Sequence, residues 1–376
     1  MLLRSALLSR GQRALLGGSR IRAVCFSSTA SASSSSTGLD LPSMAPKTLE
    51  LAQGLLKGER VCLSRAITLI ESTNPEHEKQ AELLLEYVLK NRRPGKSAFR
   101  LGITGPPGAG KSTFIEALGT MVVKEMGHRL AVIAVDPSST RTHGSILGDK
   151  TRMAKLSVEE RAFVRPSPTR GRLGGIAQHT NEVILLAESA GFDTVFVETV
   201  GLGQSEIEVD QCVDMLLLLV PPANGDELQG VKKGVMEVAD MIVVNKADGD
   251  LKTLARHAVV DYSHAVQLAR RKREGWTPPV KKCSAATGEN LKTIWEEVSK
   301  FKFQMRNDIA DRRMEQSVAW MWSNFDDQLI RYAHEDPKIV TSSANLQKNL
   351  TSGQVSPRHA ARDLMKVFLE TLKATK

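Results

Sequence analysis

The chain contains Gly105-Pro106-Pro107-Gly108-Ala109-Gly110-Lys111-Ser112-Thr113, a run that fits the phosphate-binding loop pattern G-x-x-x-x-G-K-[ST] without a mismatch. The residues before it, 99–104, are typical of a strand, and residues 114–118 after it are typical of the start of a helix. A strand, a glycine-rich loop and a helix in this order are the context that the pattern requires. The alternative is a chance glycine-rich turn before a helix.

Each part of this loop has a chemical reason. The glycines let backbone N–H groups turn onto a polyphosphate, and the helix dipole favours the same negative charge. We expect Lys111 to neutralise the β- and γ-phosphates and the Ser112 hydroxyl to bind Mg²⁺. All residues from Gly105 to Thr113 are therefore predicted to line the nucleotide.

A second motif, Asn245-Lys246-Ala247-Asp248, follows the apolar run 241–244 and predicts which base is bound. In the N-K-x-D pattern the aspartate accepts hydrogen bonds from the N1–H and 2-amino groups of guanine. Adenine offers neither donor, so ATP would leave a buried carboxylate unpaired. We expect Asn245 to brace the loop, Lys246 to lie along the base and Asp248 to select guanine. The alternative is an ordinary polar turn at the end of a strand.

A third stretch, Ser284-Ala285-Ala286, follows residues 279–283 and resembles the loop that supports guanine through backbone N–H groups in the same class of protein. The distance between the first two motifs favours a guanine-nucleotide site over a chance match. The predicted ligand is therefore GTP or GDP.

Carboxylates at the ends of two apolar strands are the candidate metal ligands. Asp136 ends the run 130–136, and Glu198 follows the run 193–197. The usual pattern at the second place is D-x-x-G, whose acid lies near Mg²⁺ and whose glycine N–H contacts the γ-phosphate; here Glu198 and Gly201 take these positions. The alternatives are a turn-forming aspartate at 136 and a surface carboxylate at 198.

The residue after this motif is also unusual. Ras-type GTPases carry a glutamine there, which orients the attacking water. This chain has Leu202, and the nearest glutamine is Gln204. Leucine cannot position water, so we expect slow intrinsic hydrolysis unless a partner or a rearranged loop supplies another group.

Four segments together resemble one family. They are residues 135–139, 144–153, 198–206 and 226–234. As a set they are similar to the metallochaperone-type GTPases that assist methylmalonyl-CoA mutase. The resemblance extends from about Leu49 to the C-terminus.

The resemblance implies roles for individual residues. It places Mg²⁺ near Ser112, Asp136, Asp149 and Glu198, and it implies three nucleotide-responsive switches at 143–153, 198–206 and 224–234. Lys111, Gln204 and Lys232 are the implied catalytic residues. Without the family, Lys232 and Lys233 would be interpreted as a solvated pair on a helix.

The composition limits the cellular setting. The chain has 376 residues and a net charge of +9, and residues 1–39 contain five arginines and no acidic residue. Without these arginines the net charge falls to +4, which gives little support to a nucleic-acid partner. An arginine- and serine-rich, acid-free start is typical of a transit peptide, so we interpret residues 1–38 as one and expect the protein in the mitochondrial matrix. We expect no membrane partner, because no apolar run there is long enough for a span.

Isolated cysteines and histidines argue against metal delivery. The four cysteines form no C-x-x-C pair and the eight histidines are scattered. This disfavours a disulfide framework and a structural zinc site. GTPases that insert nickel or zinc carry tracts rich in these residues, and this chain has none.

Helical periodicity flanks an alternating centre. We expect an α/β fold, a P-loop GTPase domain over 97–303 with a mostly parallel sheet, an N-terminal helical extension over 47–93 that packs on it, and a C-terminal helical arm over 304–376. The strands are expected to end at Thr104, Asp136, Glu198, Val220, Asn245 and Cys283. In the arm, Trp320 and Trp322 point to different faces of a helix. The resemblance makes this arm a homodimerisation element.

The leading hypothesis is a GTP-hydrolysing chaperone that gates adenosylcobalamin loading of methylmalonyl-CoA mutase and protects or reactivates that enzyme. Its implied partners are the mutase, a second copy of the chain and the adenosyltransferase that delivers the cofactor. The alternatives are a P-loop small-molecule kinase and a metal-insertion GTPase. The kinase would need an acceptor pocket with a catalytic base, and the N-K-x-D motif argues against it.

Overall fold

The computed structural model describes residues 44–93, 95, 97–136, 153–168, 179–199, 209–222 and 233–374. The predicted transit peptide lies outside this range, as do the expected site residues Asp149, Gly201, Gln204 and Lys232. The side chain of Asp136 is also outside it, although its backbone is described.

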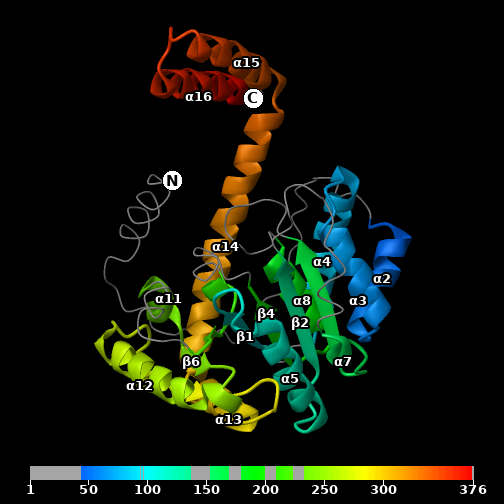
Figure 1. Cartoon of the computed structure of the whole chain (residues 1–376). Helices are drawn as coiled ribbons and strands as arrows, with labels where there is room; N and C mark the ends of the chain where they lie inside the picture. The colour runs from blue at the N-terminus through cyan, green and yellow to red at the C-terminus, as the bar shows by residue number, and fades with distance from the viewer. Residues whose placement is uncertain are drawn as a thin grey trace, which may run out of the picture. The chain divides into compact units, whose positions relative to one another are not determined.

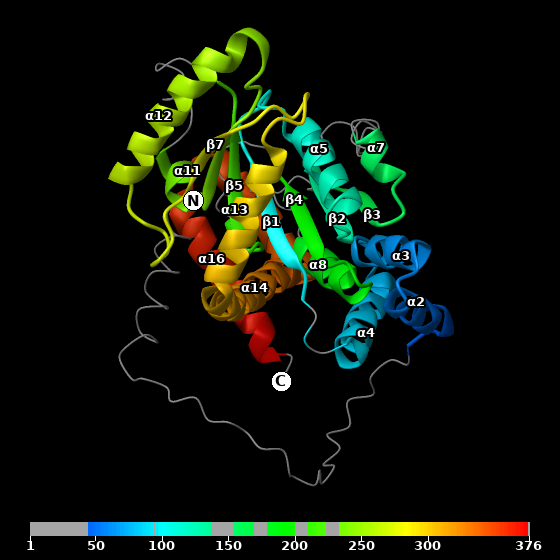
Figure 2. The same ribbon diagram turned by 90° about the horizontal axis from the view of Figure 1, so that it is seen from below.

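A parallel seven-stranded sheet forms the centre of residues 44–376, with strand order β3-β2-β4-β1-β5-β6-β7 (Figures 1 and 2). Every described pair of neighbouring strands is parallel. The strands are β1 (Phe99–Thr104), β2 (Leu130–Asp136), β3 (Ala162–Pro168), β4 (Thr194–Glu198), β5 (Met215–Val220), β6 (Met241–Val244) and β7 (Val280–Lys282). The expected α/β fold is confirmed, and six strands end within one residue of the expected positions.

The strand β3 was not expected, and its sequence explains why. It contains Pro166 and Pro168, which have no N–H to donate to a second neighbour. Proline is therefore confined to sheet edges, and β3 pairs only with β2, at the edge of the sheet. The two prolines argue against a strand in the sequence, but an edge strand tolerates them because it has no second neighbour that needs their N–H groups.

Helices cover both faces of the sheet because side chains alternate along each strand. Leu101, Ile103 and Phe196 pack with α5 (Lys111–Lys124) and α13 (Leu291–Gln304) on one face. Val195 and Val197 point to the other face, where α8 (Thr180–Ser189) lies. Further helices are α7 (Ala154–Ser157), α11 (Lys233–Val238) and α12 (Lys252–Leu268), with a 3-10 turn, η1, at Gly249–Leu251. Such a two-sided cover leaves the strand ends, where the loops lie, as the place for ligands.

Three N-terminal helices pack on the nucleotide-binding domain, as the periodicity predicts. They are α2 (Pro46–Leu56), α3 (Arg60–Ile70) and α4 (Pro75–Asn91). Each contacts α8, and the three share one buried cluster with β2 and β4. In addition, the buried carboxylate of Glu71 accepts a hydrogen bond of 2.6 Å from the Ser167 hydroxyl at the end of β3. This contact attaches α3 to the edge strand.

The C-terminal region is helical, as expected, with α14 (Arg306–Glu335), α15 (Pro337–Thr351) and α16 (Pro357–Ala374). The helix α15 was not predicted individually. Trp320 and Trp322 do lie on different faces of α14, because the Trp320 indole N–H donates to Gln211 O at 3.3 Å whereas Trp322 is 53% exposed. Among the described residues, none of the helices combines the length and apolar composition that a membrane span needs.

Candidate functional site

The phosphate-binding loop leaves β1 through a conformation that requires glycine. Gly105 has a φ of +152°, and a Cβ placed on it would lie 2.0 Å from the backbone oxygen of Leu219 in β5. Gly110, the residue before α5, has a φ of +87°, in the left-handed region. The loop can therefore pass close to β5 and turn into α5 only with glycine at these positions.

The start of α5 presents backbone donors to the loop. The Phe114 N–H donates to Gly110 O at 2.9 Å, and the N–H groups of the first turn of an α-helix point beyond its start. The Lys111 ammonium lies across the loop and donates to Gly105 O at 2.8 Å and Pro106 O at 3.3 Å. The N–H groups at a helix start, the helix dipole and an ammonium together favour a polyphosphate.

Two of the expected metal ligands are in direct contact. The Ser112 hydroxyl donates to Glu198 Oε1 at 3.0 Å, and Glu198 is buried at the end of β4. Asp136 ends the neighbouring strand β2, in which Ala134 is the register partner of Glu198. Hydroxyl and carboxylate oxygens are the donors that Mg²⁺ prefers, and Mg²⁺ usually keeps waters and phosphate oxygens as its other ligands. The residues present therefore fit this ion.

A side chain joins the phosphate loop to the predicted base loop. Asn245 is buried; its Nδ2 donates to Ala109 O at 2.9 Å, and its Oδ1 accepts from the Ala285 N–H at 3.0 Å. Burial raises the pKa of the Cys283 thiol to about 12, so this thiol stays protonated and can donate to the same oxygen at 3.6 Å. The expected bracing role of Asn245 has a definite geometry here.

The two base-loop motifs lie side by side. The Ala247 N–H donates to Cys283 O at 2.9 Å, and the Ser284 hydroxyl accepts from the Thr287 N–H at 3.2 Å, which closes the turn that includes Ala286. Asp248 is half-buried and its side chain makes no capping hydrogen bond to η1. Lys246 is exposed and has a φ of +57°, in the left-handed region. Asp248 thus follows directly after a residue that is hydrogen-bonded to Cys283, the residue before the loop predicted to support the base.

One buried pair beneath the site was not anticipated. The Thr199 hydroxyl donates to the Thr104 hydroxyl at 2.9 Å, and the Thr199 N–H donates to Ile103 O at 3.2 Å. The pair fixes the end of β4 against the end of β1, and therefore Glu198 against Ser112. Only the position of each threonine at the end of an apolar strand could have indicated this role.

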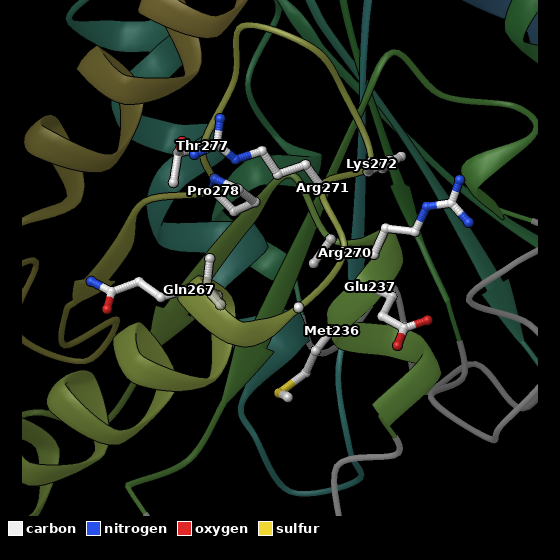
Figure 3. A pocket seen from close by; sticks show the side chains of 11 residues that line it. Met236, Glu237, Gln267, Arg270, Arg271, Lys272, Thr277 and Pro278 are labelled. Carbon is white, nitrogen blue, oxygen red and sulfur yellow. The ribbon is translucent and has the colours of Figure 1, made fainter.

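A separate pocket of about 110 Å³ lies between α11, the end of α12 and the loop leading to β7 (Figure 3). Its lining includes Met236, Glu237, Arg270, Arg271, Lys272 and Pro278. These residues precede the first residues of β6 and β7, whereas the nucleotide motifs follow the last residues of their strands. The pocket therefore lies at the amino ends of the strands, opposite the carboxyl ends that carry the nucleotide motifs, and is not part of the site described above.

The sequence and the fold also match known proteins. The model of the family described as methylmalonyl Co-A mutase-associated GTPase MeaB matches residues 63–338. The chain belongs to the MeaB family of GTPases. It is 46% identical over 327 residues to the mouse protein named methylmalonic aciduria type A homolog, mitochondrial, covering 85% of this chain and 79% of that protein. It is 44% identical over 330 residues to the Escherichia coli GTPase ArgK, covering 86% and 96%.

A solved structure agrees with this assignment. The crystal structure titled LAO/AO transport system kinase aligns with a TM-score of 0.66 and 36% identity, over 86% of this chain and 98% of that chain. The family resemblance expected from the motifs is confirmed, and the protein is a GTPase that binds guanine nucleotide. The individual residue roles remain predictions.

The position of Asp248 generates a test of base selection. In wild type we expect GTP to bind at least about a hundredfold more tightly than ATP, or about 2.8 kcal/mol, because ATP leaves the carboxylate unpaired. Asp248→Asn should weaken GTP binding and improve binding of xanthosine triphosphate, whose 2-oxo group accepts from an amide. Calorimetry measures both affinities, with Asp250→Asn in the exposed neighbouring turn as the matched control. Equal affinities of the wild type for ATP and GTP would contradict the assignment.

Proposed function

We propose that this GTPase is a chaperone of methylmalonyl-CoA mutase, in which the GTP cycle gates adenosylcobalamin loading and protects or reactivates the enzyme. The proposal rests on the guanine-nucleotide site, in which Asn245 connects Gly105–Thr113 to Ser284–Ala286 through two hydrogen bonds. The family to which the chain belongs is named for its association with that mutase. The cobalamin chemistry would belong to the partners, and this chain would hydrolyse a phosphoanhydride.

The chain's own groups would catalyse hydrolysis by position and charge. In this proposal, Ser112 and Glu198, with Asp136 and Asp149, hold Mg²⁺, which supplies positive charge to the β- and γ-phosphates when bound. Lys111 adds a cation to the same phosphates from the loop. The N–H groups at the start of α5 orient the polyphosphate. The Gly201 N–H is assigned to the γ-phosphate by its place in the motif.

Communication with the mutase would depend on nucleotide-ordered segments. We assign this role to the residues 143–153, 198–206 and 224–234, because γ-phosphate contacts commonly order such segments. Leu202 replaces the water-orienting glutamine, so Gln204, Lys232 or a group of the mutase would have to assist hydrolysis.

The proposed cellular location is the mitochondrial matrix. The acid-free, arginine-rich residues 1–38 support import into the mitochondrial matrix, and relatives from mouse and Caenorhabditis elegans carry mitochondrial names. An adenosyltransferase that supplies the cofactor would then be a second partner in the same compartment.

Two alternatives remain distinct in their chemistry. The similar solved structure is titled a kinase, and a kinase would transfer the γ-phosphate of GTP to a third compound. A metal-insertion GTPase would need a cargo site, and the part of the chain that the structure describes contains no group of three or more His, Cys, Asp or Glu residues able to hold a metal. Separation of the products of γ-labelled GTP tests the kinase alternative: labelled free phosphate supports hydrolysis, and a labelled third compound supports a kinase.

The mutase should accelerate hydrolysis. Because Leu202, and not a glutamine, comes immediately after the Glu198–Gly201 motif, part of the transition-state stabilisation is expected to come from the complex. A tenfold acceleration needs only about 1.4 kcal/mol. Single-turnover hydrolysis is measured with and without the mutase, with an unrelated matrix enzyme as the control. Gln204→Ala and Lys232→Ala test whether these two residues are needed for the acceleration by the mutase. An unchanged rate in the presence of mutase that binds the protein would contradict the coupling.

We also propose that a second copy of this chain covers the outer face of α14. This face exposes large apolar side chains at Met314, Val318, Met321, Trp322, Phe325 and Leu329, each at least 40% accessible. A contiguous apolar stripe of this kind marks an interaction surface, and a helix face pairs with its own copy about a two-fold axis.

Sedimentation velocity tests this dimer. The wild type is expected to sediment as a dimer, and Phe325→Glu should weaken association at least about tenfold, because a charge would be buried without a partner. Ser323→Glu, an exposed position on the opposite side of the same helix, is the matched control. A wild type that remains monomeric at high micromolar concentration would contradict the proposal.

A further inference from the structure

The inner face of α14 carries a row of hydrogen-bond donors. Arg312, Gln316 and Trp320 are spaced by four residues and therefore lie one helical turn apart on the same side. Arg313 lies next to them. We call Arg312, Arg313, Gln316 and Trp320 the donor face of α14. It points away from the exposed apolar stripe.

The donor face contacts mainly one short segment, residues 209–214, that lies immediately before β5, and Arg313 Nη2 also donates to Ala98 O at 2.6 Å. Arg312 Nη2 donates to Asp210 O at 2.6 Å, and Gln316 Nε2 donates to Asp210 O at 3.1 Å and Val213 O at 2.9 Å. Trp320 Nε1 donates to Gln211 O at 3.3 Å. Residues 209–210 are helical and residues 211–212 form a turn, and α14 donates to carbonyl groups of this stretch, where a helix ends.

Ion pairs attach the same two elements. The Asp214 carboxylate accepts from Arg313 Nε at 2.7 Å and Nη2 at 2.5 Å, and Asp214 is almost fully buried. The Asp210 carboxylate contacts Arg312 at 2.5 Å and Lys272 at 2.6 Å. Paired contacts between guanidinium and carboxylate groups have a fixed geometry, so α14 and residues 209–214 should move as one body.

The other side of this segment packs on β1, the strand that enters the phosphate loop. A Cβ on Gly102 would lie 2.8 Å from Val209 Cγ1 and 3.0 Å from Val213 Cγ2, so the segment approaches β1 where no side chain intervenes. The Arg100 N–H also donates to Asp214 Oδ2 at 2.8 Å, and the Asp214 N–H donates to Arg100 O at 2.9 Å. Only two residues, 103 and 104, separate Gly102 from the loop at Gly105.

Two polar atoms of the donor face are left unsatisfied in this contact. Arg312 Nε and Gln316 Oε1 are buried without a hydrogen-bond partner in the described structure. A buried polar atom without a partner costs free energy. The contact is therefore less stable than its number of hydrogen bonds alone would suggest.

We propose that the donor face of α14 couples the nucleotide site to the C-terminal helices. Residues 209–214 lie between β1 and α14, and α14 continues to α15 and α16 (Figure 1). A change at the phosphate loop that displaces β1 or residues 209–214 therefore changes the position of the exposed stripe. Arg312, Arg313, Gln316 and Trp320 act as positioning residues. The inference requires guanine-nucleotide binding and holds whether or not the mutase is the partner.

Thermodynamic reciprocity provides the first test. If the nucleotide state biases the interface, disrupting the interface must change the ratio of GDP affinity to GTP affinity. Gln316→Glu replaces the donor with an acceptor facing two carbonyl groups, and we expect the ratio, measured by calorimetry with GDP and a non-hydrolysable GTP analogue, to change about fivefold or more. Gln347→Glu, the same change at an exposed position on α15, should leave the ratio unchanged.

The two tryptophans of α14 provide the second test. Exchange of GDP for the analogue is expected to change the tryptophan fluorescence of the full chain, and the change should be clearly smaller in Trp320→Phe than in Trp322→Phe, since Trp276 and Trp295 contribute equally to both. Trp320→Phe keeps an aromatic ring, so it also serves for the affinity ratio if Gln316→Glu does not fold. An unchanged ratio in a folded donor-face variant, or a fluorescence change as large in Trp320→Phe as in wild type, overturns the proposal. A wild type that binds no guanine nucleotide would instead contradict the GTPase assignment.

Discussion

The side-chain amide of Asn245 is the contact on which the nucleotide site depends. It donates to the phosphate loop at Ala109 O and accepts from the base loop at the Ala285 N–H, so it fixes the distance between the two halves of the site. An amide suits this place because it offers a donor and an acceptor in one rigid plane. Gly110 makes room for it, since a Cβ there would lie 2.8 Å from Asn245 Nδ2. A larger residue at 110 would separate the loops.

The parallel sheet brings the two loops joined by Asn245 close together. The strands β1, β4, β5, β6 and β7 end at the same edge, so residues far apart in sequence meet there: Ser112 with Glu198, Thr104 with Thr199, and Ala247 with Cys283. Ligands bind at this edge in open α/β sheets, because the loops leave the strands there. The opposite edge has a different role, since it holds the turn at 209–212 and its contacts with α14.

Much of this arrangement was predictable from local patterns, because each motif requires a particular backbone context, a loop that follows a strand. The loop at Gly105–Thr113 and the turn at Asn245–Asp248 follow strands of apolar residues, and their places in the fold followed from that context. The strand β3 was not predictable, because Pro166 and Pro168 argue against a strand unless its edge position is known. The donor face of α14 could not be predicted for another reason: Gln316 and Trp320 donate to backbone carbonyl groups, which no side chain of the partner segment indicates.

Affinity of an Asn245→Ala variant for guanine nucleotide tests most directly whether the two loops form one site. The substitution removes both hydrogen bonds, each worth about 1 kcal/mol, and leaves Ala109 O and the Ala285 N–H without partners. Calorimetry with GDP and a non-hydrolysable GTP analogue should show an affinity about ten to a hundredfold lower than that of wild type. Asn307→Ala, at an exposed position on α14, should bind as wild type does. A folded Asn245→Ala protein with wild-type affinity would contradict the account.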